Sequence, residues 1–341
     1  MFGKAMVRGL LAVAVVCCAV AAQAVTIDTV PVGNAGNVAD TAAHSGNSAG
    51  EGAVAYNYQI GKYEVTAGQY TEFLNAVGGV DTYALYSTGM SNTSYGSGIA
   101  QSGGGTVGNP YTYSVAANFA NRPVNYVSYW DSCRFANWLD NGQPTGAQGA
   151  GTTETGAYTL TADGMNNNTI VRNTNANWVV TSEDEWYKAA YYKGGSTSAG
   201  YWDYPTKSNT APGQDMADVS GNNANYYTAP YAYPIDSGKY TTVVGEFQNS
   251  ASPYGTFDQG GNVWEWNESI PYSSCRGLRG GSFGDSDSDV LLASGRHYVD
   301  DPTDAGYSIG FRVASVPEPG SLIMTAMIAV TGLLYYRRKH A

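Results

Sequence analysis

A short segment in the last third of the chain concentrates side chains that can bind a cation. Asp258, Asn262 and Glu265 place carboxylate and amide oxygens within one stretch, which also contains Gly260 and Gly261. Glycine tolerates positive φ angles, so the two glycines allow an irregular loop in which these oxygens converge. Calcium takes mixed sets of oxygen ligands in proteins. The segment therefore predicts a rigid loop that can hold a hard cation.

The same segment opens a series of motifs that resembles the sulfatase-modifying-factor family, whose best-known member is the formylglycine-generating enzyme. The resemblance begins at about Tyr56 and covers nearly all of the expected mature chain. It implies an α+β protein with a modified C-type-lectin fold, in which a few short helices lie among many irregular strands and long loops. The motifs are EVTAGQYTEF at 64–73, SEDEWYKAA at 182–190, YGTFDQGGNVWEW at 254–266, RGGS at 279–282, Arg296, and GFR at 310–312.

The resemblance implies two structural calcium sites. Calcium binds six to eight oxygens, and both sets mix side-chain oxygens with backbone carbonyls. For Asp258 and Glu265 the alternative is an ion pair or a loop-capping role. The first site would use Asn225, the carbonyl of Tyr226, Asp236 and the carbonyl of Gly238. The second would use Asp258, the carbonyls of Gly261 and Val263, and Glu265.

The family's catalytic residues are replaced in this chain. In the formylglycine-generating enzyme, two cysteines just after the GGS block bind copper and the substrate thiol. Asp285 stands at the first of these positions and Val290 at the second. Cu(I) requires soft thiolate or thioether ligands, which a carboxylate does not replace. We therefore expect neither copper binding nor this oxidase chemistry.

Two other groups of residues could form a cation site or a catalytic triad. Asp285, Asp287 and Asp289 alternate, so a strand would place them on one face as a hard-cation site, whereas a solvated acidic loop is the alternative favoured by their composition. His297 is the histidine within the expected domain, and a catalytic triad with Ser294 or Asp300 lacks a nucleophile elbow. We expect His297 to line the old substrate groove or to make a structural hydrogen bond.

Aromatic and polar residues define a candidate ligand groove. Aromatic faces bordered by polar groups suit carbohydrate or peptide ligands. The candidate groove residues are Trp264, Trp266, Ser282, Arg296 and His297.

Composition narrows the class of partner. Charged residues make up only 13 % of the 341 residues, and the formal net charge is −11. Ordinary soluble domains contain about 25 % charged residues. Nucleic acids are bound by clustered Lys and Arg, so a nucleic-acid partner is not expected. The 43 glycines and 28 tyrosines suit an exported protein rich in loops and strands.

Both ends of the chain carry processing signals. Residues 1–24 are predicted to form a Sec-type signal peptide, because Lys4 and Arg8 precede an apolar run that ends in small residues. Residues 316–341 resemble the PEP-CTERM sorting signal, with Pro-Glu-Pro at 317–319, an apolar helix and a basic end. This resemblance implies a transient anchor in the inner membrane and processing by an exosortase-type protease. The alternative is a permanent C-terminal anchor.

Local patterns predict where the chain folds. Residues 25–55 are expected to be an extended lead-in, and residues 56–315 the folded domain. Capping boxes predict helices that begin after Thr66, Ser128 and Ser182. Long loops are expected at 78–119 and 143–178. Cys133 is expected in the core, and its pairing with Cys275 is left open.

These observations predict an exported protein at the surface or in the matrix of a Gram-negative bacterium that makes extracellular polysaccharide. The domain is expected to be a non-catalytic binding or structural module, stabilised by calcium, with a polysaccharide or peptide ligand. The alternative is an oxidase of the formylglycine-generating type, or a related enzyme with altered chemistry.

Overall fold

The computed structural model describes residues 24–42, 50–227, 235–236, 238–297 and 300–317. The expected leader and the C-terminal sorting signal lie almost entirely outside these ranges. Within them, no helix has the length and apolar character needed to cross a membrane.

The helices begin where local sequence signals place them. Helices α1 (Ala67–Val77), α2 (Tyr129–Asp140) and α4 (Glu183–Tyr191) each start with a complete capping box. In each box a Ser or Thr side chain accepts from the backbone N–H three residues on, whose own side chain accepts in return. The three predicted helix starts are therefore confirmed. A shorter helix, α3 (Ala162–Asn166), lies in the segment 143–178 that was expected to be a loop.

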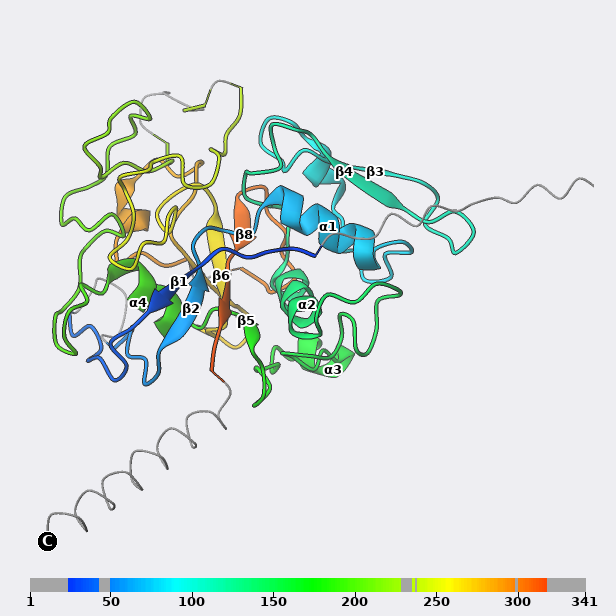
Figure 1. The fold of residues 1–341 in the computed structure, drawn as a ribbon, viewed down its shortest axis with the longest axis horizontal. Helices are drawn as coiled ribbons and strands as arrows, with labels where there is room; N and C mark the ends of the chain where they lie inside the picture. The colour runs from blue at the N-terminus through cyan, green and yellow to red at the C-terminus, as the bar shows by residue number, and fades with distance from the viewer. Residues whose placement is uncertain (1–23, 43–49, 228–234, 237, 298–299, 318–341) are drawn as a thin grey trace, which may run out of the picture.

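Two small sheets form the centre of the fold. The first is antiparallel, in the order β1 (Thr29–Val32), β2 (Tyr58–Gly61), β9 (Val313–Ser315) and β5 (Trp178–Val180). The second has the order β7 (Gly277–Arg279), β6 (Trp264–Asn267) and β8 (Ile309–Phe311), with β8 parallel to β6. In Figure 1, these strands lie between α4 on one side and the pair α1 and α2 on the other. The predicted α+β class is confirmed.

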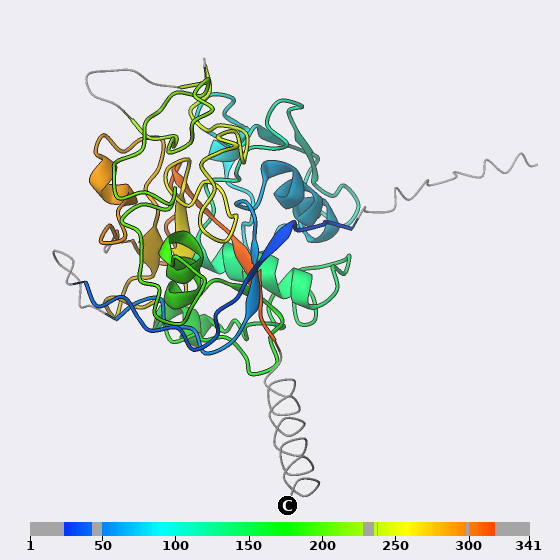
Figure 2. The ribbon, with the colours of Figure 1, turned by 60° about the vertical axis from the view of Figure 1, so that its left-hand side comes forward.

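Two segments expected to be irregular contain strands. Thr29–Val32 pairs with β2 in antiparallel register, and Val32 is fully buried, so the folded domain starts earlier than the predicted Tyr56. Figure 2 shows this dark blue strand next to β2, which pairs in turn with the C-terminal strand β9. The loop at 78–119 contains a short 3₁₀ helix, η1 (Thr88–Ser91), and a hairpin of β3 (Ile99–Ser102) and β4 (Thr112–Val115). The Gly-rich segment at 103–110 is the turn signal between β3 and β4, whereas β1 and β2 are separated by more than twenty residues.

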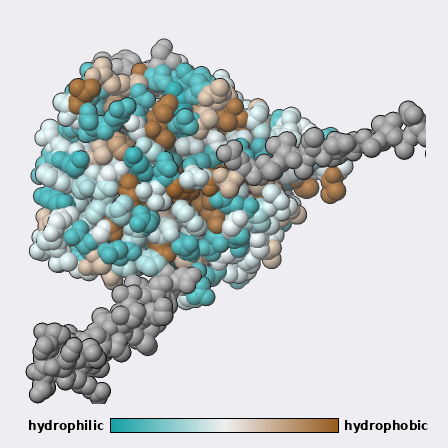
Figure 3. Space-filling view, viewed as in Figure 1, coloured by the Kyte–Doolittle hydropathy of each residue, from teal (hydrophilic) through white to brown (hydrophobic). Residues whose placement is uncertain are grey.

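An aromatic cluster fixes α1 and α2 against the strands. The ring of Phe135 lies 5.3 Å from Phe73, 5.7 Å from Trp138 and 5.4 Å from Phe311, measured between centroids. These are usual spacings for aromatic pairs in protein cores. Cys133 is also fully buried on α2, as expected, and both it and Cys275 are free thiols. The outer face drawn in Figure 3 is mostly hydrophilic, with small scattered apolar patches.

Arg312 joins the two sheets. It lies between β8 in one sheet and β9 in the other, and its side chain is fully buried. The guanidinium contacts both carboxylate oxygens of Glu265 on β6, at 2.5 and 2.6 Å, and donates to the carbonyl of Gly61 at the end of β2. A single side chain thus connects strands from both sheets.

Removing this guanidinium is expected to destabilise the fold strongly. Arg312→Met leaves the fully buried carboxylate of Glu265 without its counter-charge, which costs about 3–5 kcal/mol. Urea unfolding monitored by circular dichroism measures the loss. Lys207→Met, at an exposed position, is the control and should change stability by less than about 0.5 kcal/mol. A loss below about 1 kcal/mol for Arg312→Met would contradict the role assigned to the pair.

Candidate functional site

The cation-binding loop has the irregular backbone that its glycines predicted. Asp258, Gly261 and Asn262 all have positive φ angles, of 59°, 85° and 64°. A Cβ atom on Gly261 would lie 2.3 Å from the carbonyl oxygen of Asn225, so no larger residue fits there. The N–H of Asn262 donates to that same carbonyl at 2.7 Å. The loop therefore brings the two predicted calcium ligand sets side by side.

In the second predicted set, Glu265 makes an ion pair. Besides both contacts with Arg312, its carboxylate accepts a hydrogen bond of 2.7 Å from the indole N–H of Trp186. This is the ion-pair role considered from the sequence. Among the described residues, the carboxylate of Asp258 accepts one hydrogen bond, of 2.6 Å, from the N–H of Gly245. A small cavity of about 10 Å³ adjoins Asp258.

A third carboxylate lies beside this set. Glu64, just before α1, is 1 % exposed, and neither of its carboxylate oxygens has a hydrogen-bond partner among the described residues. Burial raises its pKa well above the ordinary value, and the charges of Asp258 and Glu265 raise it further. Burial likewise raises the pKa of Asp258 to about 6. Unpaired buried carboxylates are costly.

The carboxylates around Glu64 outnumber the positively charged groups that face them. When ionised, the carboxylates of Glu64, Asp258 and Glu265 oppose the single guanidinium of Arg312. The excess of negative charge equals the charge that Ca²⁺ would supply, and oxygens of this type are its ligands. Glu64 and Asp258 therefore carry the unbalanced negative charge of this region, whereas Glu265 is paired with Arg312.

In the first predicted set, most of the oxygens already have protein partners. The carboxylate of Asp236 is paired with Arg122, and the carbonyl of Tyr226 accepts from the side chain of Gln214. Asn225 and Gly238, the other two members, also form hydrogen bonds within the protein. The side chain of Asn225 donates to the carbonyl of Tyr240, and the Gly238 carbonyl accepts from Ser94. Over the described ranges, no group of three or more His, Cys, Asp or Glu residues has a metal-binding arrangement.

The candidate groove is a small polar pocket of about 210 Å³. Trp264, Ser282, Asp285 and His297 all line it. The carboxylate of Asp285 accepts from the backbone N–H of Ser282 at 2.8 Å and from its hydroxyl at 2.7 Å. Asp285 therefore acts as a local cap that orients Ser282.

His297 pairs with a carboxylate at the edge of this pocket. Its Nδ1 lies 2.5 Å from Oδ2 of Asp300, and its ring is 5.4 Å from the ring of Trp264. The hydrogen bond with Asp300 is the main cause that raises the pKa of His297, and Asp285 adds to it. The imidazole thus contacts both the carboxylate of Asp300 and the indole ring of Trp264.

Three other sequence candidates lie outside the pocket. Trp266 is fully buried and donates its indole N–H to the carbonyl of Val127, so it belongs to the core. Arg296 is paired with Glu183 at the start of α4, which also binds Arg279. Val290 packs against an apolar cluster around Leu291.

The acidic loop adopts the solvated alternative. Asp287 and Asp289 are exposed, and Asp287 caps the short 3₁₀ helix η2 (Ser288–Leu291). The segment is not a strand, so the three aspartates do not share one face.

Comparison with known proteins identifies the family. The sequence matches the family described as sulfatase-modifying factor enzyme 1-like domain over residues 19–316. The chain belongs to this family. None of the curated proteins matches the sequence.

Solved structures support the family's fold. The crystal structure of CarF superposes with a TM-score of 0.53 at 21 % identity, covering 86 % of this chain and 99 % of CarF. Treponema denticola variable protein 1 gives 0.52 at 19 % identity, covering 87 % and 97 %. PvdO from Pseudomonas aeruginosa gives 0.45 at 21 %, covering 85 % and 92 %. At these identities the likeness concerns the fold alone.

The pocket of this sulfatase-modifying-factor domain does not fit Cu(I). None of the residues lining it is a cysteine or a methionine. Cys133 is buried on α2, where burial raises its thiol pKa far above the ordinary value. Cys275 is buried too, and its carbonyl accepts from Asn168. The pocket offers carboxylate, hydroxyl and imidazole groups as ligands, and these are too hard for Cu(I).

Two residues of these sites were not predicted from the sequence. Glu64 belongs to the motif at 64–73 but was not expected beside the loop at 258–263, and Tyr307 was not expected in the pocket. The motif alone does not distinguish a buried Glu64 from an ordinary surface glutamate. The burial of Glu64 depends on contacts with segments nearly two hundred positions away.

The His297–Asp300 pair predicts a measurable titration shift. The pKa of His297 should lie above 6.5 in the native protein and return toward that value in Asp300→Asn, which removes the charge but keeps the shape. Histidine ring signals followed by NMR against pH measure both values. Asp289→Asn, which changes an exposed carboxylate that does not line the pocket, is the control. Equal pKa values in wild type and Asp300→Asn would contradict the pairing.

Proposed function

We propose that this chain is an exported, non-catalytic binding module of the cell surface or extracellular matrix. The observation that carries this proposal is Asp285, which stands at the first copper-ligand position and is committed to Ser282 through two hydrogen bonds. With Val290 packed in an apolar cluster, the pocket keeps polar recognition groups but has no soft ligand. Recognition without redox chemistry suits such a pocket.

The proposed location follows from the two ends of the sequence. The signal-peptide pattern at 1–24 directs the chain to export, and the PEP-CTERM-like pattern at 316–341 directs it to an exosortase-type protease after transient anchoring in the inner membrane. Chains of this kind are expected where extracellular polysaccharide accumulates. The acidic net charge of −11 disfavours nucleic acid as a partner.

An enzymatic role is the second candidate. The feature that favours it is the pocket itself, which places an imidazole, a serine hydroxyl and carboxylates around about 210 Å³. No hydrogen bond joins Ser282 to His297 among the described contacts, since the hydroxyl of Ser282 donates to Asp285. A nucleophile needs a base within hydrogen-bond reach, so the arrangement favours binding over catalysis.

An aldehyde assay tests the non-catalytic role. The protein is incubated with Cu(I), oxygen and a cysteine-containing sulfatase peptide, and formylglycine is detected by hydrazide labelling and mass spectrometry. We expect no aldehyde above the blank, because both copper-ligand positions are occupied by other residues. A cysteine-bearing member of the family serves as the positive control. Aldehyde formed at a rate proportional to protein concentration would establish the oxidase alternative.

We also propose that calcium binds beside the loop at 258–263, with Glu64 and Asp258 as its carboxylate ligands. The support is the excess of buried negative charge there and the lack of a partner for Glu64 among the described residues. The ion would have a structural role, since it would connect the strand before α1 with the cation-binding loop. Such a link stabilises the native state by mass action.

Calcium is expected to raise the melting temperature, and chelation to lower it. In chelator, stability should fall as pH rises, because the pKa of Asp258 is about 6 in the folded state and 3.8 when unfolded. A raised pKa contributes stability at low pH that is lost above the folded value. Saturating calcium should reverse this fall by several degrees.

A pair of matched variants makes the calcium experiment specific. Glu64→Gln removes one ligand and should abolish most of the calcium-dependent shift, while Glu72→Gln, on α1 with its side chain partly buried, should keep it. Differential scanning calorimetry in calcium and in chelator measures both. An identical calcium response in wild type and Glu64→Gln, or none in wild type, would rule out this site.

A further inference from the structure

A larger cavity lies beside α2 and α3. It has a volume of about 740 Å³, and its lining includes the start of α2, the end of α3 and three loops. We call it the α2–α3 cavity. It shares no lining residue with the pocket at Ser282. The contributing segments are 83–84, 128–134, 165–168, 273–274 and 301–305.

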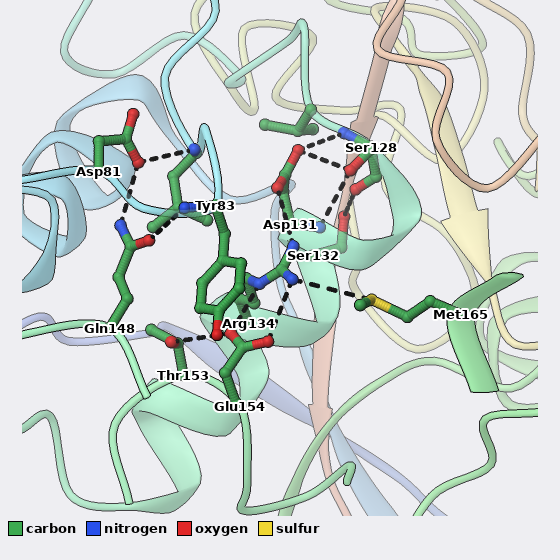
Figure 4. A network of polar contacts seen from close by, with 12 residues as sticks. Asp81, Tyr83, Ser128, Asp131, Ser132, Arg134, Gln148, Thr153, Glu154 and Met165 are labelled. Atoms are coloured by element: carbon green, nitrogen blue, oxygen red, sulfur yellow. Dashed lines mark hydrogen bonds and ion pairs between the residues drawn. The ribbon is translucent and has the colours of Figure 1, made fainter. Parts of the chain in front are cut away.

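An aromatic ring and a guanidinium form one wall of the α2–α3 cavity. The guanidinium carbon of Arg134 lies 4.5 Å from the ring centroid of Tyr83, which is a stacking arrangement (Figure 4). Tyr83 is 39 % exposed, so part of the residue remains accessible to a ligand. The side chain of Gln148 fixes the Tyr83 loop by accepting from its backbone N–H at 2.8 Å and donating to Asp81 at 3.0 Å. The platform is therefore held in place before any ligand arrives.

The charge of this wall is net negative, because the guanidinium of Arg134 faces the carboxylates of both Glu154 and Asp131. Two nitrogens of Arg134 bind the two carboxylate oxygens of Glu154, at 2.8 and 3.1 Å, and Asp131 lies 3.7 Å away on the other side. Asp301, also at the cavity, is exposed and acidic. The cavity thus offers no surplus positive charge for a phosphate, sulfate or uronate group. A neutral ligand meets no electrostatic penalty there.

The remaining lining supplies hydrogen-bond donors and acceptors of neutral type. Asn166, Ser273, Ser274 and Thr303 are all exposed at the cavity. Trp130 also lines it, and the indole N–H of Trp130 is buried with no hydrogen-bond partner among the described residues. Amides and hydroxyls can each both donate and accept, as sugar hydroxyls do.

We propose that the α2–α3 cavity binds a neutral oligosaccharide, with Tyr83 as the stacking platform for a sugar ring. A pyranose has an apolar C–H face that suits an aromatic ring and a rim of hydroxyls that suits the surrounding amides and hydroxyls. A peptide would also use an aromatic platform, but the exposed amide of Asn166 and the neighbouring hydroxyls favour a ligand dense in hydroxyl groups.

Two of the segments that build or support this cavity come from the long loops expected from the sequence. Tyr83 lies in the loop at 78–119, and Gln148, Glu154 and α3 lie in the segment at 143–178. The proposal names a ligand class for the binding role proposed above and rests on that role. It concerns a different site, however. A negative saccharide titration would therefore contradict this proposal alone, whereas aldehyde formation would contradict the non-catalytic role.

Isothermal titration of the purified protein with cellohexaose, maltohexaose and xylohexaose tests the proposal. At least one of these neutral probes is expected to bind, and a hexamer of galacturonate to bind more weakly than that probe. Tyr83→Ala should weaken the binding about tenfold, because it removes the platform. Tyr83→Phe should retain most of it, because the ring remains.

Tyr95→Ala is the matched control. Tyr95 is 40 % exposed, nearly the same as Tyr83, and does not line the α2–α3 cavity. Its loss should leave the affinity unchanged, and circular dichroism checks that each variant is folded. The proposal is overturned if none of the neutral probes binds at millimolar concentration, if the galacturonate hexamer binds best, or if Tyr83→Ala and Tyr95→Ala have equal effects.

Discussion

The buried pair between Glu265 and Arg312 holds together the parts of the domain on which both candidate sites depend. Glu265 is in the middle strand of one sheet, and Arg312 lies where the chain leaves that sheet and enters the other. Both side chains are fully buried, so neither charge can be left without the other. The cation-binding loop precedes β6, and the pocket at Ser282 lies beside the same strand.

Because Arg312 pairs with Glu265, it does not neutralise the carboxylate of Glu64. One guanidinium satisfies Glu265, and nothing among the described residues does the same for the oxygens of Glu64. The pocket and the α2–α3 cavity differ from this region, because their acids are paired or exposed: Asp300 with His297, and Glu154 with Arg134. The fold therefore separates a place suited to a cation from two places suited to polar ligands.

Much of the framework could be predicted because its signals are local. A capping box spans four residues, so Thr66, Ser128 and Ser182 identified the helix starts without any knowledge of the fold. Strands were harder. Thr29–Val32 lies in a segment of low apolar periodicity and becomes a strand through pairing with β2, whereas β3 and β4 are each only four residues long.

The sequence by itself determined the family and the acidic, glycine-rich composition, because both depend only on residue identity, and it predicted that Asp285 and Val290 replace the copper ligands. Only the tertiary structure decided what the charged and aromatic groups do. Trp264 lines a pocket while Trp266, two residues on, is covered by core residues, and Glu265 has Arg312 as its partner while Glu64 is buried without one. Burial and pairing depend on which distant segments meet, and that is settled only when the chain folds.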